Sequence, residues 1–142
     1  MADGAEASAS NTHDPRSGEP FPFKCGWFGD GGLGEKMIDA IVSGRKTATA
    51  CPVYDPEDAE FREGDRLQLT DKHGRPRGLL RIVKIEVRPL SSFDEALAAR
   101  EGSGTLSELK EKLDFANGRD LPPNEEMRVV HFEMIRGTPK NP

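Results

Sequence analysis

The sequence predicts an α+β fold: a small, curved and mostly antiparallel β-barrel with flanking helices. Segments 66–70, 79–90 and 127–135 alternate apolar and polar side chains, as half-buried strands do. Apolar residues at helical spacing mark 33–42 instead, and two short helices are expected before the last strand. A sheet with one apolar face must bury that face, and helices at its ends do so economically.

The chain divides into a foldable middle and two tails. Residues 1–20 contain no large apolar side chain after Met1, so they bury too little surface to offset the entropy of ordering. They also lack the basic start and apolar run of a secretory signal. We therefore expect a flexible tail over 1–20, one domain over 21–136, and a flexible tail over 137–142.

Composition narrows the class of protein. Two cysteines in 142 residues are too few for a disulfide framework, and no apolar run approaches the ~20 residues of a membrane-spanning helix. We therefore expect a cytoplasmic protein with no membrane partner. The formal net charge of −5 argues against broad coating of nucleic acid, although a local basic pocket is compatible with it.

The first half of the domain reads as a strand, a helix and a second strand. An aromatic, strand-like segment over 21–28 is broken by the sequence GDGGLGE. The helix expected over 33–42 is followed by Gly44, a residue typical of helix C-termini. A short strand is expected over 47–50.

The second half carries a bend and two helix starts. Apolar side chains change parity within 79–90, which predicts a bulge near residue 82. Ser92 with Glu95, and Thr105 with Glu108, have the spacing of a capping box, in which a hydroxyl and a carboxylate bond free N–H groups.

The sequence SGRKTATA at 43–50 places charges where the helix gives way to a strand. Taken alone, Lys46 is a cation that complements the helix dipole. Lys46 and Thr49 are three residues apart, so on a regular strand they point to opposite faces. They converge only if the turn at Gly44 leaves Lys46 outside the strand.

Three segments together resemble the ASCH domain family, whose fold is similar to the PUA fold. They are GRKTATA after the first helix, FREGDRLQL after a loop, and EGSGTLSELKEK further on. The family motif G-x-K-x-x-T stands here at Gly44, Lys46 and Thr49. The resemblance implies a small barrel associated with nucleosides or RNA.

One branch of that family is more similar in motif: the bacterial amidohydrolases that deacetylate N4-acetylcytidine. Their G-R-K-T-x-T pattern matches 44–49, and their glutamate before T-L-[ST]-E-L-K matches Glu101. The resemblance implies that Lys46 accepts a proton, Thr49 is the nucleophile and Glu101 donates a proton, with neither metal nor cofactor. Cys51 stands where the strand of this branch continues to an arginine.

Further side chains are candidates for binding a nucleoside substrate. Trp27 and Phe28 offer a platform on which a base can stack, or else they seal the core. Arg45 and Thr47 flank the lysine, and Tyr54 lies in an acidic loop. We expect these five residues to contact a small nucleoside.

The alternative is a module that binds RNA or a modified nucleotide, with ribonuclease activity as a variant of that function. Arg75, Arg77 and Arg81 form a local basic cluster on the expected hairpin, which is either an RNA contact or a solvated turn. The acidic net charge favours the small substrate over long RNA. The oligomeric state stays open.

Overall fold

The computed structural model describes residues 19–55 and 60–137. The tails expected over 1–20 and 137–142 therefore lie almost wholly outside the described residues. The last strand runs through Gly137, which pairs with Gly78, so it extends one residue past the expected boundary of the domain.

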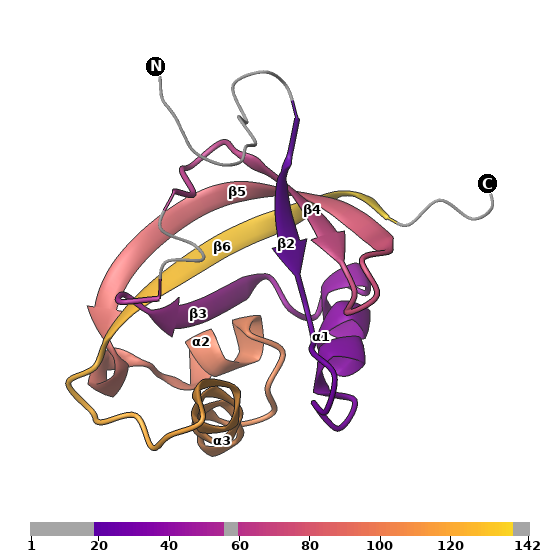
Figure 1. Ribbon diagram of the computed structural model, residues 1–142. Coiled ribbons are helices and arrows are strands. Elements are labelled where there is room, and N and C mark those ends of the chain that lie inside the picture. The colour runs from indigo at the N-terminus through magenta and orange to yellow at the C-terminus, as the bar shows by residue number, and fades with distance from the viewer. Residues whose placement is uncertain (1–18, 56–59, 138–142) are drawn as a thin grey trace.

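Five strands of the described residues form one curled sheet in the order β2-β4-β5-β6-β3. The strands are β2 (Phe21–Lys24), β3 (Ala48–Pro52), β4 (Arg66–Thr70), β5 (Pro76–Pro89) and β6 (Glu126–Gly137). Every neighbouring pair is antiparallel except β2 and β4. Long β5 and β6 arch over the helices in Figure 1. The expected α+β class and curved, mostly antiparallel sheet are confirmed, with the sheet curled into a half-barrel.

The bend predicted near residue 82 is present. The register between β5 and β6 shifts between Ile82 and Lys84, so Val83 has no partner in the ladder. Its side chain is 49% exposed, whereas that of Ile82 is buried. A bulge at this position bends β5, so that one long strand can follow the curl of the sheet.

In the described part of the chain, three α-helices flank the sheet: α1 (Leu33–Val42), α2 (Glu95–Arg100) and α3 (Leu106–Asn117). At the start of α3 the Thr105 hydroxyl accepts from the Glu108 N–H, as predicted. The cap predicted at Ser92 is wrong, since Asp94 accepts from the Leu97 N–H instead. Ser92 belongs to a preceding 3-10 turn (η4, Leu90–Ser92), where its hydroxyl donates to the Pro89 carbonyl.

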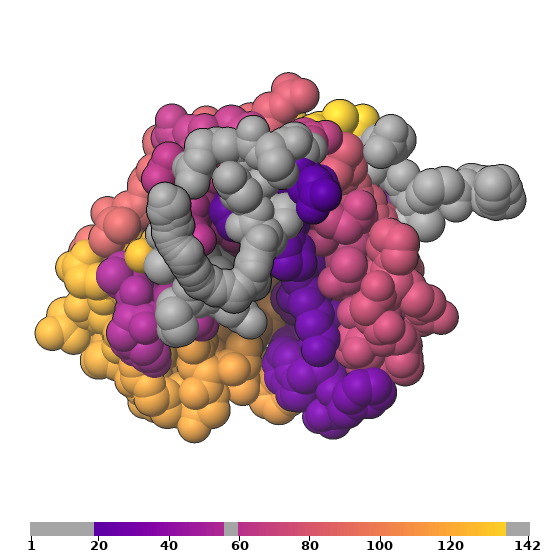
Figure 2. Space-filling model, turned by 45° about the horizontal axis from the view of Figure 1, so that its top comes forward, coloured from indigo at the N-terminus to yellow at the C-terminus, as the bar shows by residue number. Residues whose placement is uncertain are grey.

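Strand β6 is buried on both faces and separates two apolar cores. One face packs Met127 and Val129 against α2 and α3, and the other packs Val130 and Phe132 with α1, β2 and β4. Figure 2 shows the N-terminal segment with α1, in indigo and violet, next to the orange segment that carries α3. The functional site described below lies between these two halves.

Within the described part of the chain, no helix has both the length and the apolar character needed to cross a bilayer.

Candidate functional site

Lys46 stands just outside the sheet, in the short link between α1 and β3. Helix α1 ends at Val42, and Gly44 has a φ of 86°, the left-handed conformation that turns the chain away from the helix. The Lys46 N–H then donates to the Ala40 carbonyl at 2.9 Å. Because β3 begins only at Ala48, Lys46 is free of the strand's alternation.

Glu101 reaches Lys46 from the end of α2. The backbones of Lys46 and Glu101 form an isolated antiparallel bridge, next to a 2.6 Å hydrogen bond from the Thr47 N–H to the Arg100 carbonyl. Gly102 follows with a φ of 82°, and a Cβ there would lie 3.1 Å from the Lys46 Cβ. An alanine here would be strained by its backbone conformation and crowded against Lys46, so glycine is favoured at this turn.

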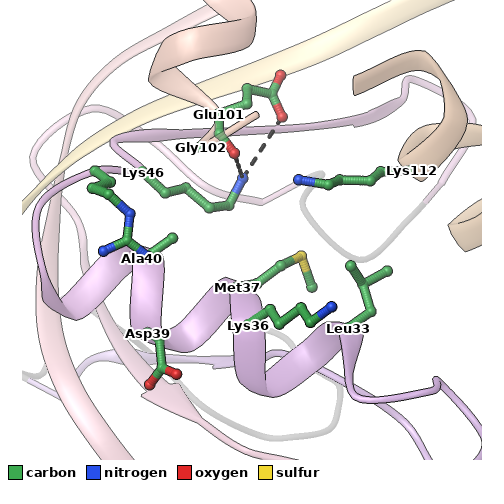
Figure 3. A pocket seen from close by; sticks show the side chains of 10 residues that line it. Leu33, Lys36, Met37, Asp39, Ala40, Lys46, Glu101, Gly102 and Lys112 are labelled. Atoms are coloured by element: carbon green, nitrogen blue, oxygen red, sulfur yellow. Dashed lines mark hydrogen bonds and ion pairs between the residues drawn. The ribbon is translucent and has the colours of Figure 1, made fainter. Parts of the chain in front are cut away.

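The two side chains form a buried ion pair. The Lys46 ammonium lies 3.7 Å from Glu101 Oε1 and donates to the Glu101 carbonyl at 3.1 Å (Figure 3). It also donates to the Ala48 carbonyl at 2.7 Å. Lys46 is 4% and Glu101 5% exposed. Among the described residues, nothing bonds Glu101 Oε2, although it is fully buried. An unpaired carboxylate oxygen leaves one acceptor for a ligand.

Burial shifts the pKa values of both groups toward neutrality. Loss of solvent raises the pKa of Glu101 to about 6, and the Lys46 charge only partly opposes this. Burial also lowers the pKa of Lys46, against the attraction of Glu101. A carboxyl with a raised pKa thus lies beside an amine with a lowered pKa, and shifts in these directions suit acid–base chemistry.

The pair forms part of the wall of a pocket of about 270 Å³ between α1, α2 and α3. That volume is near the lower end of the ~300–1,000 Å³ of small-molecule sites. Figure 3 shows Lys112 of α3 directed toward Lys46 and Glu101. The lining residues are Leu33, Lys36, Met37, Asp39, Ala40, Arg45, Lys46, Glu101, Gly102 and Lys112.

Thr49 lies on β3, half-buried and opposite Val130, and it does not line the pocket. In the described part of the chain its hydroxyl makes no hydrogen bond. The Ala48 carbonyl that binds the Lys46 ammonium belongs to the peptide unit that leads into Thr49. The threonine is therefore a neighbour of the pair through the backbone, while its side chain lies apart from the pocket lining.

Only one of the other expected substrate contacts lines the pocket. Arg45 does so, whereas Thr47 contributes backbone bonds. The Tyr54 hydroxyl accepts from Arg119 at 2.6 Å, away from the pocket lining.

The rings of the two aromatic candidates, Trp27 and Phe28, contact different parts of the protein. Trp27 packs on Phe115 of α3, with ring centroids 5.8 Å apart. Phe28 is 70% exposed and lies beside Lys72 and His73. Because these rings have different neighbours, Trp27 and Phe28 do not form one stacking platform.

The basic cluster expected on the hairpin is largely neutralised by carboxylates. Arg77 binds Glu35 at 2.7 Å and Asp71 at 3.2 Å. Arg75 also binds Asp71, at 2.9 Å, and the resulting bonds hold the pKa of that carboxyl well below its usual range. Arg81 binds Glu133 at 3.3 Å. These guanidinium groups are thus partnered within the protein.

Two further basic residues were not foreseen, Lys112 in the pocket wall and Arg128 on β6. Lys112 donates to the Ser103 hydroxyl at 3.2 Å and lines the pocket. The sequence offers one signal for Lys112: it directly precedes buried Leu113 and so lies at the margin of the buried face of α3. Arg128 pairs across the sheet with Cys51, and within the described residues its buried Nη1 has no partner. Strand β6 thus places an arginine directly opposite Cys51 in the ladder with β3.

Fold and site together define an α+β half-barrel protein with a buried lysine–glutamate pair in a pocket of small-molecule size. The family model of the ASCH domain matches residues 24–136. The chain therefore belongs to the ASCH domain family.

Solved structures show the same fold. An Enterococcus faecalis V583 protein is 23% identical, with a TM-score of 0.66 over 86% of this chain and 80% of that one. An ASCH domain from Lactobacillus crispatus JV V101 is 18% identical, with a TM-score of 0.66 over 88% of this chain and 87% of that one. No curated protein is significantly similar in sequence.

Proposed function

We propose that this ASCH protein is a small hydrolase that cleaves the amide of an N-acylated cytosine nucleoside such as N4-acetylcytidine. The observation that carries the proposal is the buried pair of Lys46 and Glu101 in the wall of the pocket. Amide hydrolysis needs a base for the nucleophile and an acid for the departing nitrogen. The pKa shifts of the two residues suit those two roles.

The proposed first step requires the Thr49 side chain, which stands outside the pocket lining, to turn toward the bound amide. Its hydroxyl then attacks the acyl carbon while neutral Lys46 takes its proton. The tetrahedral intermediate then collapses, the bond from carbon to the exocyclic nitrogen breaks, and protonated Glu101 gives its proton to that nitrogen. Free cytidine leaves and an acyl ester remains on Thr49. Water cleaves this ester, which releases acetate and restores the hydroxyl. The sum is one amide and one water converted to one amine and one carboxylic acid.

The reactive form, with neutral Lys46 and protonated Glu101, arises from the ion pair without taking up a proton from solvent. Ionised Lys46 with ionised Glu101 holds one proton, and so does neutral Lys46 with protonated Glu101. Moving that proton from the ammonium to the carboxylate, once the 3.7 Å contact shortens to hydrogen-bonding distance, interconverts the two forms. Burial disfavours charge on either group, which favours the form needed for the reaction.

Ion pairs already formed by the hairpin arginines argue against the alternative function, an RNA-binding or ribonuclease module. These residues are Arg75, Arg77 and Arg81. A phosphate backbone would have to displace the carboxylates that already bind them. The small pocket also suits one nucleoside better than a strand.

The test is deacetylation of N4-acetylcytidine by the purified protein and three variants: Lys46→Ala, Thr49→Ala and Glu101→Gln. We expect each variant to lose about 100-fold or more in kcat/KM. Thr49→Ser should retain part of the activity because it keeps the hydroxyl.

Lys84→Ala and Glu111→Gln, which alter exposed residues, are the matched controls and should match the wild type. A wild-type protein that leaves N4-acetylcytidine intact contradicts the proposal. Full activity in the Lys46→Ala and Glu101→Gln variants contradicts it as well.

A further inference from the structure

The pocket carries more positive charge than its buried pair accounts for. Four cationic and two acidic side chains line it, a surplus of two positive charges in a protein whose formal net charge is −5. Lys46 and Glu101 offset each other. The surplus therefore comes from Lys36, Arg45 and Lys112, against Asp39 alone.

These three cations differ from many basic residues elsewhere in the protein. Among residues 19–55 and 60–137, Lys36, Arg45 and Lys112 form no ion pair. Within the described residues, the side-chain hydrogen bonds of Arg45 and Lys112 go to the hydroxyls of Ser43 and Ser103, respectively. By contrast, ion pairs engage Lys72, Arg75, Arg77, Arg81, Arg88, Lys110 and Arg119. Cations left without a carboxylate in a concave site are available to an anionic ligand.

Lys36 and Lys112 belong to opposite walls of the pocket. Lys36 is on α1 and Lys112 is on α3, and both side chains line the same space (Figure 3). The Lys112 ammonium extends toward the buried pair in Figure 3. Its charge lowers the pKa values of both Lys46 and Glu101, which places it within electrostatic range of each. Two ammonium groups from two helices suit a phosphate, which accepts bonds on several oxygens.

We infer that Lys36 and Lys112 bind the phosphate of a mononucleotide, so that the pocket takes a cytidine 5′-monophosphate unit in preference to the free nucleoside. The nucleoside part of this ligand rests on the proposed function. The phosphate part rests on the two lysines alone. A pocket of about 270 Å³ holds one such unit rather than a strand.

The experiment is calorimetric titration of the protein with cytidine and with cytidine 5′-monophosphate. We expect the monophosphate to bind at least about tenfold more tightly, as charge-assisted hydrogen bonds to phosphate provide, and its advantage to shrink as salt is added. The double variant Lys36→Met/Lys112→Met should bind both ligands equally. Lys112→Arg, which keeps the charge, should preserve most of the advantage.

Lys110→Met is the matched control. Lys110 precedes Lys112 by two residues on α3, but its ammonium is held by Asp114 and Asp120 and does not line the pocket. This variant should keep the full preference for the monophosphate. Thermal unfolding of every variant establishes that it is folded before it is titrated.

Equal affinity of the wild type for both ligands overturns the inference, and so does failure of both to bind. A preference that survives in the double variant overturns it too. If a short RNA binds more tightly than the monophosphate through the same lysines, the mononucleotide is the wrong ligand and the site binds an RNA strand. If the monophosphate preference holds but N4-acetylcytidine is not cleaved, the hydrolase proposal alone fails. If cleavage occurs without any preference, the phosphate inference alone fails.

Discussion

The Lys46 ammonium lies 3.7 Å from the Glu101 carboxylate, and the backbones of the two residues pair in one antiparallel bridge, although 55 positions separate them. The bridge fixes the distance between the two backbone segments, so the two side chains are held close to each other. Burial is imposed on both groups at once, so their protons are shared by a pair rather than held by separate residues.

The pair should give amide hydrolysis a bell-shaped pH dependence. The reactive form holds one proton in total, so kcat/KM should fall on the acid side as pH drops below about 6, where Glu101 and Lys46 are both protonated. It should fall again on the alkaline side through the lowered pKa of Lys46, below the usual value of 10.5. Glu101→Gln should remove the acid limb from any residual activity. A flat profile between pH 5 and 7 would contradict this assignment.

Breaking the pair should cost more stability than replacing it. Lys46→Met leaves Glu101 buried without its counter-charge, and we expect a loss of roughly 3–5 kcal/mol at pH 7. The pKa of Glu101 then rises further above its unfolded value of 4.5. Because the folded state favours the protonated acid, stability is fullest below pH 4.5 and is lost as pH rises through the folded pKa.

The double variant Lys46→Met/Glu101→Leu removes both charges while it keeps the space filled, so it distinguishes the effect of the ion pair from that of packing. Apolar residues of similar size should restore stability to within about 1 kcal/mol of the wild type, or above it. Urea unfolding at pH 5 and pH 8 measures both effects. Losses that simply add in the double variant would show that the two residues do not act as a pair.

Gly102 should tolerate alanine less well than Gly118. Both have positive φ, 82° and 68°, so alanine is strained at either site by about 1–2 kcal/mol. At Gly118 a Cβ meets nothing within 4 Å, whereas at Gly102 it lies 3.1 Å from the Lys46 Cβ. The difference between the two variants in urea unfolding therefore isolates the contact with Lys46. Gly102→Ala should also lower kcat/KM, and equal behaviour of the two variants would contradict the close approach.

Arg77→Met should leave RNA affinity unchanged. The guanidinium is held by Glu35 and Asp71, so it is not available to a phosphate. Fluorescence anisotropy with a single-stranded RNA measures how the affinity depends on salt. Loss of a phosphate contact would reduce the slope of log K against log salt by about 0.7 per contact. We expect no change in slope but a lower thermal midpoint, since Arg77 links the β4–β5 hairpin to α1.

Features that depend on neighbouring residues could be predicted from the sequence. The helix at 33–42, its end at Gly44 and the bulge near Ile82 follow from periodicity and from glycine's backbone freedom, and all three are present. The Thr105 cap follows from spacing alone. The Ser92 cap failed because Asp94, two residues later, offers a carboxylate at the actual start of α2.

Features that depend on distant segments could not be predicted in the same way. The resemblance singled out Lys46 and Glu101, but only the folded chain brings them together across α1 and α2. Lys112 and Arg128 carry no local motif, because their roles arise from an opposing helix and a cross-strand partner. Spacing in the sequence predicts which residues share one face of a helix or strand. Contacts between different elements can be predicted only when the register of the whole sheet is known.

The bridge between Lys46 and Glu101 makes the site more sensitive to chain length than to residue type. Inserting or deleting one residue between Ala40 and Lys46, or between Leu97 and Glu101, would shift the pairing by one position and turn the wrong side chain toward the partner. Substitutions at exposed positions of these segments leave that count intact. Related chains that keep this chemistry should therefore vary in the composition of the two segments and hold their lengths constant.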